Sequence, residues 1–168
     1  MHIKVCGRDC GYAEGTQQER GSTMFSKIVV GTDGSEAAVR ALKLACELAE
    51  KCDASLSIIH VPRPETVAFA LGAVAGYHMV TTMPPDEEVE EAAQKVLELA
   101  GEAATVPVEQ SEIRHGDPGD ETVAFAKDIG ADLIVTGRRA LANLAGLVVG
   151  STSQRITHIA PCAVLTVP

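Results

Sequence analysis

Three consecutive residues, Gly150-Ser151-Thr152, open a stretch with helical character and have the chemistry to bind a phosphate group. The first N–H groups of a helix have no partner within it, and the helix dipole adds partial positive charge there. Such a helix start favours phosphate oxygens, and the hydroxyl groups of Ser151 and Thr152 can donate to them. The alternative is purely structural. Ser151 and Gln154 have the spacing of a capping box, which stabilises a helix start without any ligand.

A second polar segment, Gly31-Thr32-Asp33-Gly34-Ser35, follows the apolar run Ile28-Val29-Val30. An apolar run that ends in a turn is typical of a buried strand. The carboxylate of Asp33 could accept a hydrogen bond from a ribose hydroxyl or help to hold a nucleotide-bound Mg²⁺. An aspartate in such a loop also commonly bonds to its own backbone, which is the structural alternative.

Two histidines, His60 and His115, are expected near strand ends, where an imidazole could act as a base. No nucleophile or set of metal ligands accompanies either of them in the sequence. We interpret them as polar residues that close strands, and the sequence indicates no catalytic residue. Any hydrolysis of a bound ligand would therefore be slow and secondary.

The predicted elements alternate between strand and helix, which brings the two polar segments together. Strands are expected at 28–30, 55–61, 108–114, 132–136 and 163–167, and helices at 36–51, 86–104, 120–129 and 151–158, with Ser35 capping the first helix and a turn at 115–119. This order predicts an α/β fold with a five-stranded, parallel, doubly wound sheet. Ligands bind such sheets at the carboxyl ends of the strands, where the strand order reverses. If the first and fourth strands are neighbours, Gly31–Ser35 and Thr136–Thr152 meet there.

The 168 residues have the length of one domain, which we place at 24–168. Residues 1–23 lack an apolar period and are expected to form a flexible N-terminal extension, or to precede Met24 as the alternative initiator. The connection 62–85 contains Gly and Pro and lacks a clear pattern, so we expect a lid or a mobile loop.

Composition and charge exclude several classes of function. A net charge of -9 without clustered Lys and Arg argues against nucleic-acid binding, and no apolar stretch is long enough to insert into a membrane. Five cysteines without a signal peptide favour a reduced, cytoplasmic setting. We expect Cys46, Cys52 and Cys162 to be buried or half-buried apolar residues.

The spacing of the glycines makes a family resemblance specific. Gly137-Arg138-Arg139-Ala140, followed by nine residues and Gly150-Ser151, resembles the nucleotide signature of the universal stress protein (UspA-like) family. In that pattern a glycine, two residues, a second glycine, nine residues and Gly-Ser/Thr surround the ribose and phosphates. The likeness continues through Lys27–Ser35, Ile59–Val61, Ala131–Gly137 and Ala160–Leu165, and covers about 25–168.

The resemblance implies the Rossmann-like fold of the adenine nucleotide alpha-hydrolases and a homodimeric stress-response protein that binds ATP or a related adenine nucleotide, with Mg²⁺ carried by the nucleotide. By position, Gly31, Asp33 and Val61 would border the adenine and ribose; Thr136, Gly137 and Ala140 would line the ribose and first phosphates; Gly150, Ser151 and Thr152 would hold the later phosphates. Arg138 and Arg139 could pair with phosphates as well.

Ala140 stands where the family pattern has its second glycine. If that position needs a positive φ or a close phosphate, the methyl group costs about 1 kcal/mol or blocks the contact. Two alternatives to a nucleotide-binding regulator therefore stay open. One is a nucleotide-free signalling dimer of the same fold. The weaker one, by analogy of fold alone, is an adenylate-forming or ATP-hydrolysing enzyme.

The final strand, Ala163 to Val167, is apolar and near a sheet edge, so a second copy of the chain could pair with it. We expect a homodimer through this strand, together with an unidentified protein partner.

Overall fold

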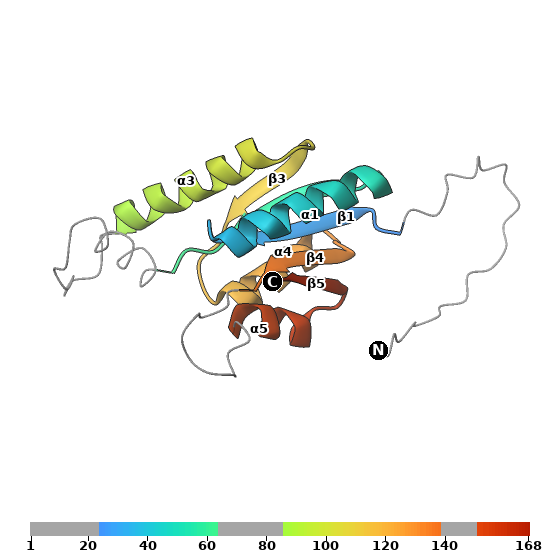
Figure 1. Ribbon diagram of the computed structural model, residues 1–168. Coiled ribbons are helices and arrows are strands. Elements are labelled where there is room, and N and C mark those ends of the chain that lie inside the picture. Colours follow the sequence, from blue (N-terminus) through green and yellow to red (C-terminus); the bar gives the residue numbers. More distant parts are fainter. Residues whose placement is uncertain (1–23, 64–85, 139–150) are drawn as a thin grey trace, which may run out of the picture.

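The computed structural model describes residues 24–63, 86–138 and 151–168 (Figure 1). In chain order the elements are β1 (Lys27–Thr32), α1 (Glu36–Cys52), β2 (Ser55–His60), α3 (Asp86–Ala103), β3 (Val108–Ile113), α4 (Pro118–Asp128), β4 (Leu133–Gly137), α5 (Ser151–Ile159) and β5 (Ala163–Val167). The strands form one parallel sheet in the order β3-β2-β1-β4-β5. The predicted α/β fold class is confirmed. The sheet also meets the condition on which the two polar segments would meet, since β1 lies beside β4.

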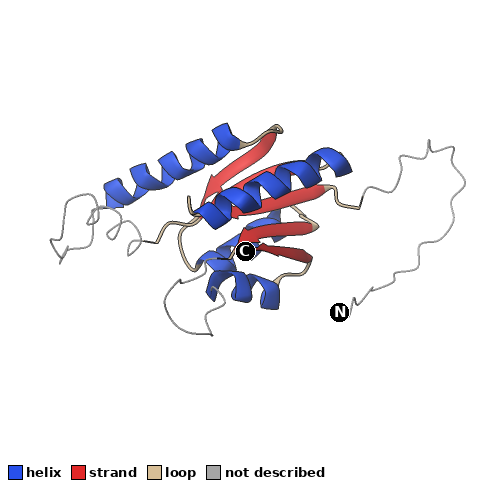
Figure 2. Ribbon diagram, viewed as in Figure 1, coloured by secondary structure: helices blue, strands red, loops and turns tan. Residues whose placement is uncertain are grey.

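Helices cover both faces of the sheet (Figure 2). On one face, α1 and α3 pack on side chains that include Ile28 and Val30; on the other, α4 and α5 pack on side chains that include Val29 and Ile134. Neighbouring residues of a strand point to opposite faces, so a strand buried on both faces is apolar without interruption. The run Ile28-Val29-Val30 has this pattern, and all three residues are fully buried.

The starts of two helices show how capping side chains position the chain. Ser35 Oγ accepts a hydrogen bond from Ala38 N (3.3 Å), which confirms the predicted cap of α1. For α4 the prediction was wrong, since the helix begins at Pro118 and not at residue 120. Asp117 Oδ1 caps it by accepting from Gly119 N (2.9 Å) and Asp120 N (3.1 Å). Pro118 has no N–H to satisfy and suits the first helical position.

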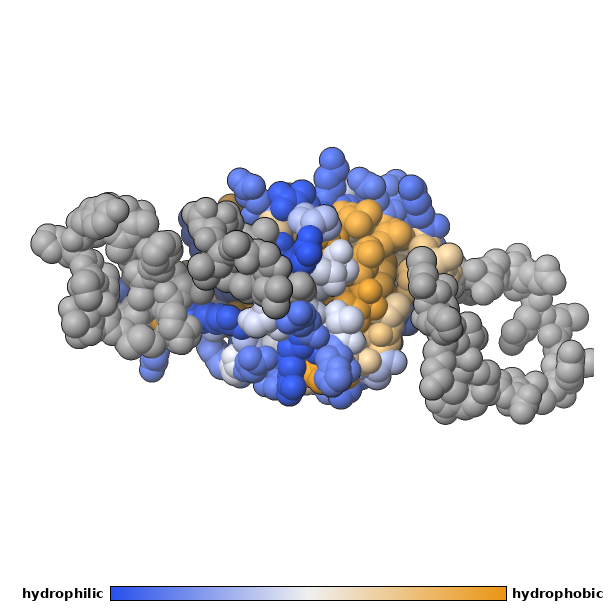
Figure 3. Space-filling model, turned by 60° about the horizontal axis from the view of Figure 1, so that its bottom comes forward, coloured by the Kyte–Doolittle hydropathy of each residue, from blue (hydrophilic) through white to orange (hydrophobic). Residues whose placement is uncertain are grey.

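One edge of the sheet is β5, which pairs with β4 alone among the described strands. Its residues Val164 to Val167 are only partly buried. Figure 3 shows an apolar strip on the face of the molecule that carries this edge, with hydrophilic residues above and below it. As an edge strand with partly buried residues, β5 has one side without a described strand partner.

Two further features bear on the sequence predictions. No helix in the described part of the chain is long and apolar enough to cross a membrane. Cys46 is buried while Cys52 and Cys162 are half-buried, as expected, and all three are free thiols.

Candidate functional site

The carboxyl ends of β1 and β4 lie side by side and define the reversal point of the sheet. Gly31 is in register with Thr136. Gly137, the last residue of β4, and Asp33, the first residue after β1, therefore lie at the same edge of the sheet. The chain leaves β1 toward β2 and β3 and later returns to β4 on the opposite side. The described residues of the predicted site are Gly31, Asp33, Val61, Thr136, Gly137, Arg138, Ser151 and Thr152, whereas Arg139, Ala140 and Gly150 lie outside the described residues.

Asp33 lies in a tight turn between β1 and α1. Its Oδ1 accepts a hydrogen bond from Ser35 N (3.0 Å), while Thr32 Oγ1 accepts one from Gly34 N (3.4 Å). Gly34 has φ +74°, a conformation that side chains with a Cβ rarely adopt. The turn-forming role of Asp33 is therefore present, and it fixes the carboxylate at the carboxyl end of β1.

Gly137 brings the end of β4 against the start of α1. A Cβ at this position would lie 2.6 Å from the carbonyl carbon of Ala37 and 2.7 Å from Ala38 N. Such distances are too short for any side chain, and the neighbouring atoms belong to the backbone. Gly31 differs, since a Cβ there would meet the side chain of Thr122 at 3.8 Å, an ordinary contact. Close packing thus requires glycine at 137 but not at 31.

Val61 and Thr136 have little exposed side-chain surface, with 8% and 5% of the residue exposed. Val61 packs with Val29 and Ile59 in the core on the α4 and α5 side of the sheet. Thr136 Oγ1 donates to the carbonyl of Gly137 at 3.4 Å. A ligand at this edge would therefore meet Val61 mainly through its backbone.

His60 ends β2 and links it to β1. The residue is 6% exposed, and its Nδ1 lies 2.7 Å from the carbonyl oxygen of Thr32. Because a carbonyl only accepts, Nδ1 carries the proton. Burial lowers the pKa of His60, and this outweighs the hydrogen bond to Thr32 and the nearby charge of Asp33, which act in the opposite direction. The neutral ring closes the strand, as the sequence suggested.

One contact joins the two sides of the reversal point and was missed by the sequence analysis. Arg63 follows β2, and its Nη2 donates a hydrogen bond to Thr152 Oγ1, in the first turn of α5, at 3.0 Å. In the sheet, β1 lies between β2, which precedes Arg63, and β4, which precedes α5 in the chain. The signal available in the sequence was the position of Arg63, directly after a strand that ends at this edge. No motif marked it.

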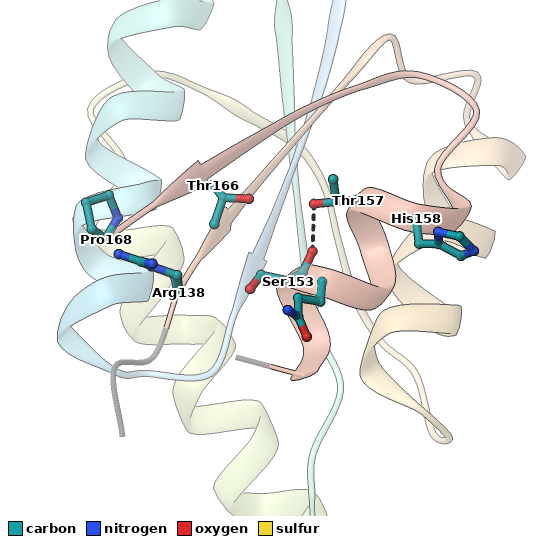
Figure 4. Close-up of a pocket in the computed structure, with 7 residues that line it drawn as sticks. Arg138, Ser153, Thr157, His158, Thr166 and Pro168 are labelled. Atoms are coloured by element: carbon teal, nitrogen blue, oxygen red, sulfur yellow. Dashed lines mark hydrogen bonds between the residues drawn. The ribbon is translucent and has the colours of Figure 1, made fainter. Parts of the chain in front are cut away.

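A separate cleft of about 700 Å³ lies on the other flank of β4, between α5 and β5 (Figure 4). Of the predicted site residues that the structure describes, Arg138 alone lines it, together with Ser153, Gln154, Thr157, His158, Thr166 and Pro168. Figure 4 shows Arg138 and His158 at opposite ends of the cleft, and Thr157 bonded to the carbonyl of Ser153 (2.8 Å). Since its polar groups do not converge, we place the candidate site at the reversal point.

The described residues contain no group of three or more His, Cys, Asp or Glu side chains arranged to hold a metal ion. Asp33 alone would be a weak Mg²⁺ ligand. Mg²⁺ commonly binds through one or two carboxylates plus the phosphates of its nucleotide, and Asp33 fits that arrangement only.

Comparison with known proteins supplies the family. The model of the Universal stress protein family matches residues 24–168. The chain is 36% identical over 149 residues to universal stress protein YxiE of Bacillus subtilis, covering 86% of this chain and 99% of that protein. It is 33% identical over 147 residues to universal stress protein MJ0531 of Methanocaldococcus jannaschii, covering 88% and 84%.

The fold comparison agrees. A solved universal stress protein in complex with cAMP superposes with a TM-score of 0.63 at 26% identity, covering 86% of this chain and 97% of that one. The family model, the curated relatives and the shared fold lead to the same conclusion. The chain belongs to the universal stress protein family.

Proposed function

We propose that this protein binds an adenine nucleotide, ATP or a relative, at the carboxyl ends of β1 and β4 and acts as a regulatory stress-response protein in the cytoplasm. The observation that carries the proposal is the Arg63–Thr152 hydrogen bond, which joins the segment after β2 to the start of α5. A guanidinium and a hydroxyl group, both able to donate to phosphate, meet there. The relative solved with cAMP supports an adenine nucleotide as the ligand.

The phosphates would lie at the start of α5. Ser151 and Thr152 lie in the first described turn of α5, where their hydroxyl groups and the backbone N–H groups could donate to phosphate oxygens. A capping box of Ser151 with Gln154 is the structural alternative. Gly150, Ala140 and Arg139 would complete the phosphate end, as the family pattern implies, whereas Arg138 lines the separate cleft between α5 and β5.

The adenine and ribose would lie toward β1 and β2. Gly31 is half-buried, and the edge of the adenine base could pack against its backbone. Asp33 would accept a hydrogen bond from a ribose hydroxyl or coordinate Mg²⁺ held by the phosphates. Val61 would border the base through its backbone, and Thr136 with Gly137 would line the ribose. We assign no catalytic residue, so the bound nucleotide would serve as a signal.

In a homodimer that pairs through β5, nucleotide binding would change the surface that the dimer presents to a partner. The apolar strip at the β5 edge and the partly buried residues of this strand support pairing with a second copy. Because β5 is bonded to β4, and β4 leads into the proposed phosphate site, binding could alter the dimer face. The alternative, a nucleotide-free dimer, would use the same edge without the ligand.

Two measurements test the proposal. Small molecules released by acid from the purified protein should include ATP, ADP or AMP in near-stoichiometric amount by mass spectrometry. Emptied protein should show a higher unfolding temperature in millimolar Mg-ATP, since a ligand that binds only the native state stabilises it by RT ln(1 + [L]/Kd). Empty protein together with no thermal shift would favour the nucleotide-free dimer.

A further inference from the structure

Among the described residues, Arg63 forms no ion pair, unlike three other arginines. Arg40 pairs with Glu36, Arg114 with Glu112 and Asp128, and Arg155 with Asp120. The guanidinium of Arg63 pairs with no described carboxylate and bonds instead to the neutral hydroxyl of Thr152. A guanidinium carries five donors, so one hydroxyl satisfies only part of its capacity.

The two residues before Arg63 anchor the chain at this point. Val61 and Pro62 are buried, and the proline ring fixes its own φ. The hydrogen bond to Thr152 then holds the half-buried Arg63 near the start of α5, although the two residues are 89 positions apart. An arginine in an acidic protein, with a net charge of -9, is thereby placed beside the N–H groups of a helix start.

The same hydrogen bond orients Thr152. Its Oγ1 accepts from Arg63, which leaves its own O–H to donate to another acceptor. The first turn of α5, the Thr152 hydroxyl and the Arg63 guanidinium therefore offer donors from two elements of the fold. Phosphate oxygens accept charge-assisted, bidentate hydrogen bonds from guanidinium groups, which a lysine cannot reproduce.

We propose that Arg63 binds the phosphate chain of the nucleotide and makes the site selective for ligands that carry several phosphates. The inference rests on the proposed nucleotide site and adds to it a phosphate contact from the β2 side. The affinity for the nucleoside would not depend on Arg63. The affinity for a ligand would rise with each phosphate within reach of the guanidinium.

The test measures binding of ATP, adenosine and tripolyphosphate to wild-type protein, Arg63→Ala and Arg63→Lys by titration calorimetry. Arg63→Ala should weaken ATP and tripolyphosphate about tenfold or more, because a hydrogen bond to a charged group is lost, and should change adenosine affinity less than twofold. Arg63→Lys should fall between. Arg155→Ala is the matched control, since Arg155 lies on α5 but pairs with Asp120, and it should bind as wild type does.

Salt dependence gives a readout that a structural role would not change. ATP affinity of the wild type should fall more steeply with NaCl concentration than that of Arg63→Ala, because one fewer charge contacts the phosphates. Equal slopes would overturn the inference. So would an unchanged ATP affinity in Arg63→Ala, or an equal loss for ATP and adenosine.

The wild-type titrations separate this inference from the proposed function. Binding of ATP that does not depend on Arg63 overturns the inference and leaves the nucleotide site standing. Binding of tripolyphosphate that depends on Arg63, without any gain from the adenosine part of ATP, supports the inference and contradicts an adenine site. No binding of ATP or tripolyphosphate overturns both.

Discussion

Gly137 packs so closely on Ala37 that a Cβ at position 137 would lie 2.6 Å from the carbonyl carbon of Ala37. This contact sets the separation between the end of β4 and the start of α1, the two elements that border the candidate site. The atoms in the way belong to the backbone of a helix, so no rotation of a side chain can relieve the clash. The first glycine of the family pattern therefore has a packing role as well as its proposed role in binding.

Gly137→Ala should lower the free energy of unfolding by about 2 kcal/mol, the usual cost of overpacking. Urea unfolding followed by circular dichroism measures it. Gly31→Ala is the matched control at the neighbouring strand end, where the nearest atoms would be 3.8 Å from the new methyl group, and it should change stability by less than about 0.5 kcal/mol. Equal stabilities of the two variants would contradict the packing argument.

His60→Asn should change how stability depends on pH. Burial holds the pKa of His60 below its ordinary value of 6.5, so the unfolded chain binds more protons just below pH 6.5. The free energy of unfolding of the wild type should therefore fall as pH is lowered through 6.5, by at most about 1.4 kcal/mol per pH unit. Asparagine can still donate to the Thr32 carbonyl but does not titrate.

The expected result is a flatter profile between pH 5 and 7 for His60→Asn in urea unfolding. His115→Asn is the control, because the His115 side chain is 67% exposed and its one ion-pair partner among the described residues is Glu90. A variant whose profile matches that of the wild type would show that His60 does not cause the dependence.

Asp132→Asn should weaken the junction between β4 and the chain before β1. Burial by itself would raise the pKa of Asp132, but hydrogen bonds from Ser26 Oγ (2.6 Å), Ser26 N (2.8 Å) and Lys27 N (3.2 Å) outweigh it and lower the pKa below 3.8. The carboxylate thus stabilises the fold above pH 3.8, and this contribution is lost as pH falls below that value.

At neutral pH the free energy of unfolding of the Asp132→Asn variant should be lower than that of the wild type by about 1 kcal/mol. This value is small for hydrogen bonds to a charged group because the carboxylate is partly exposed. The difference from wild type should shrink as pH falls below 4. The exposed Glu98→Gln on α3 is the control and should behave as wild type does. A constant difference between pH 3 and 7 would contradict a role of the ionised carboxylate.

Ala140→Gly should tighten nucleotide binding about fivefold if the methyl group stands where the family pattern places a glycine against phosphate. Residue 140 is outside the described residues, so this prediction rests on the sequence pattern. Titration of ATP into the two proteins measures it. Ala142→Gly, in the same segment but outside the pattern, controls for added backbone freedom and should leave the affinity unchanged.

Much of the fold could be predicted because its signals are local. The uninterrupted apolar strands and the alternation of strand and helix define a doubly wound sheet, and the reversal point follows from strand order. The start of α4 was misplaced because Asp117 and Pro118 suit a turn as well as a helix start. The contact of Arg63 with Thr152 and that of Gly137 with Ala37 join distant parts of the chain. Neither leaves a local pattern, so only the structure could show them.

The most direct test of the central claim is a titration of Mg-ATP into wild-type protein freed of bound small molecules, compared with the Ser151→Ala/Thr152→Ala double variant. The double variant should unfold at a somewhat lower temperature without ligand, because the Arg63–Thr152 hydrogen bond is lost; affinities are therefore compared at a temperature at which both proteins are folded. The account predicts saturable binding to the wild type at one nucleotide per chain, weakened at least tenfold in the double variant. No binding to the wild type, or equal affinity in both, would contradict a nucleotide site at the start of α5.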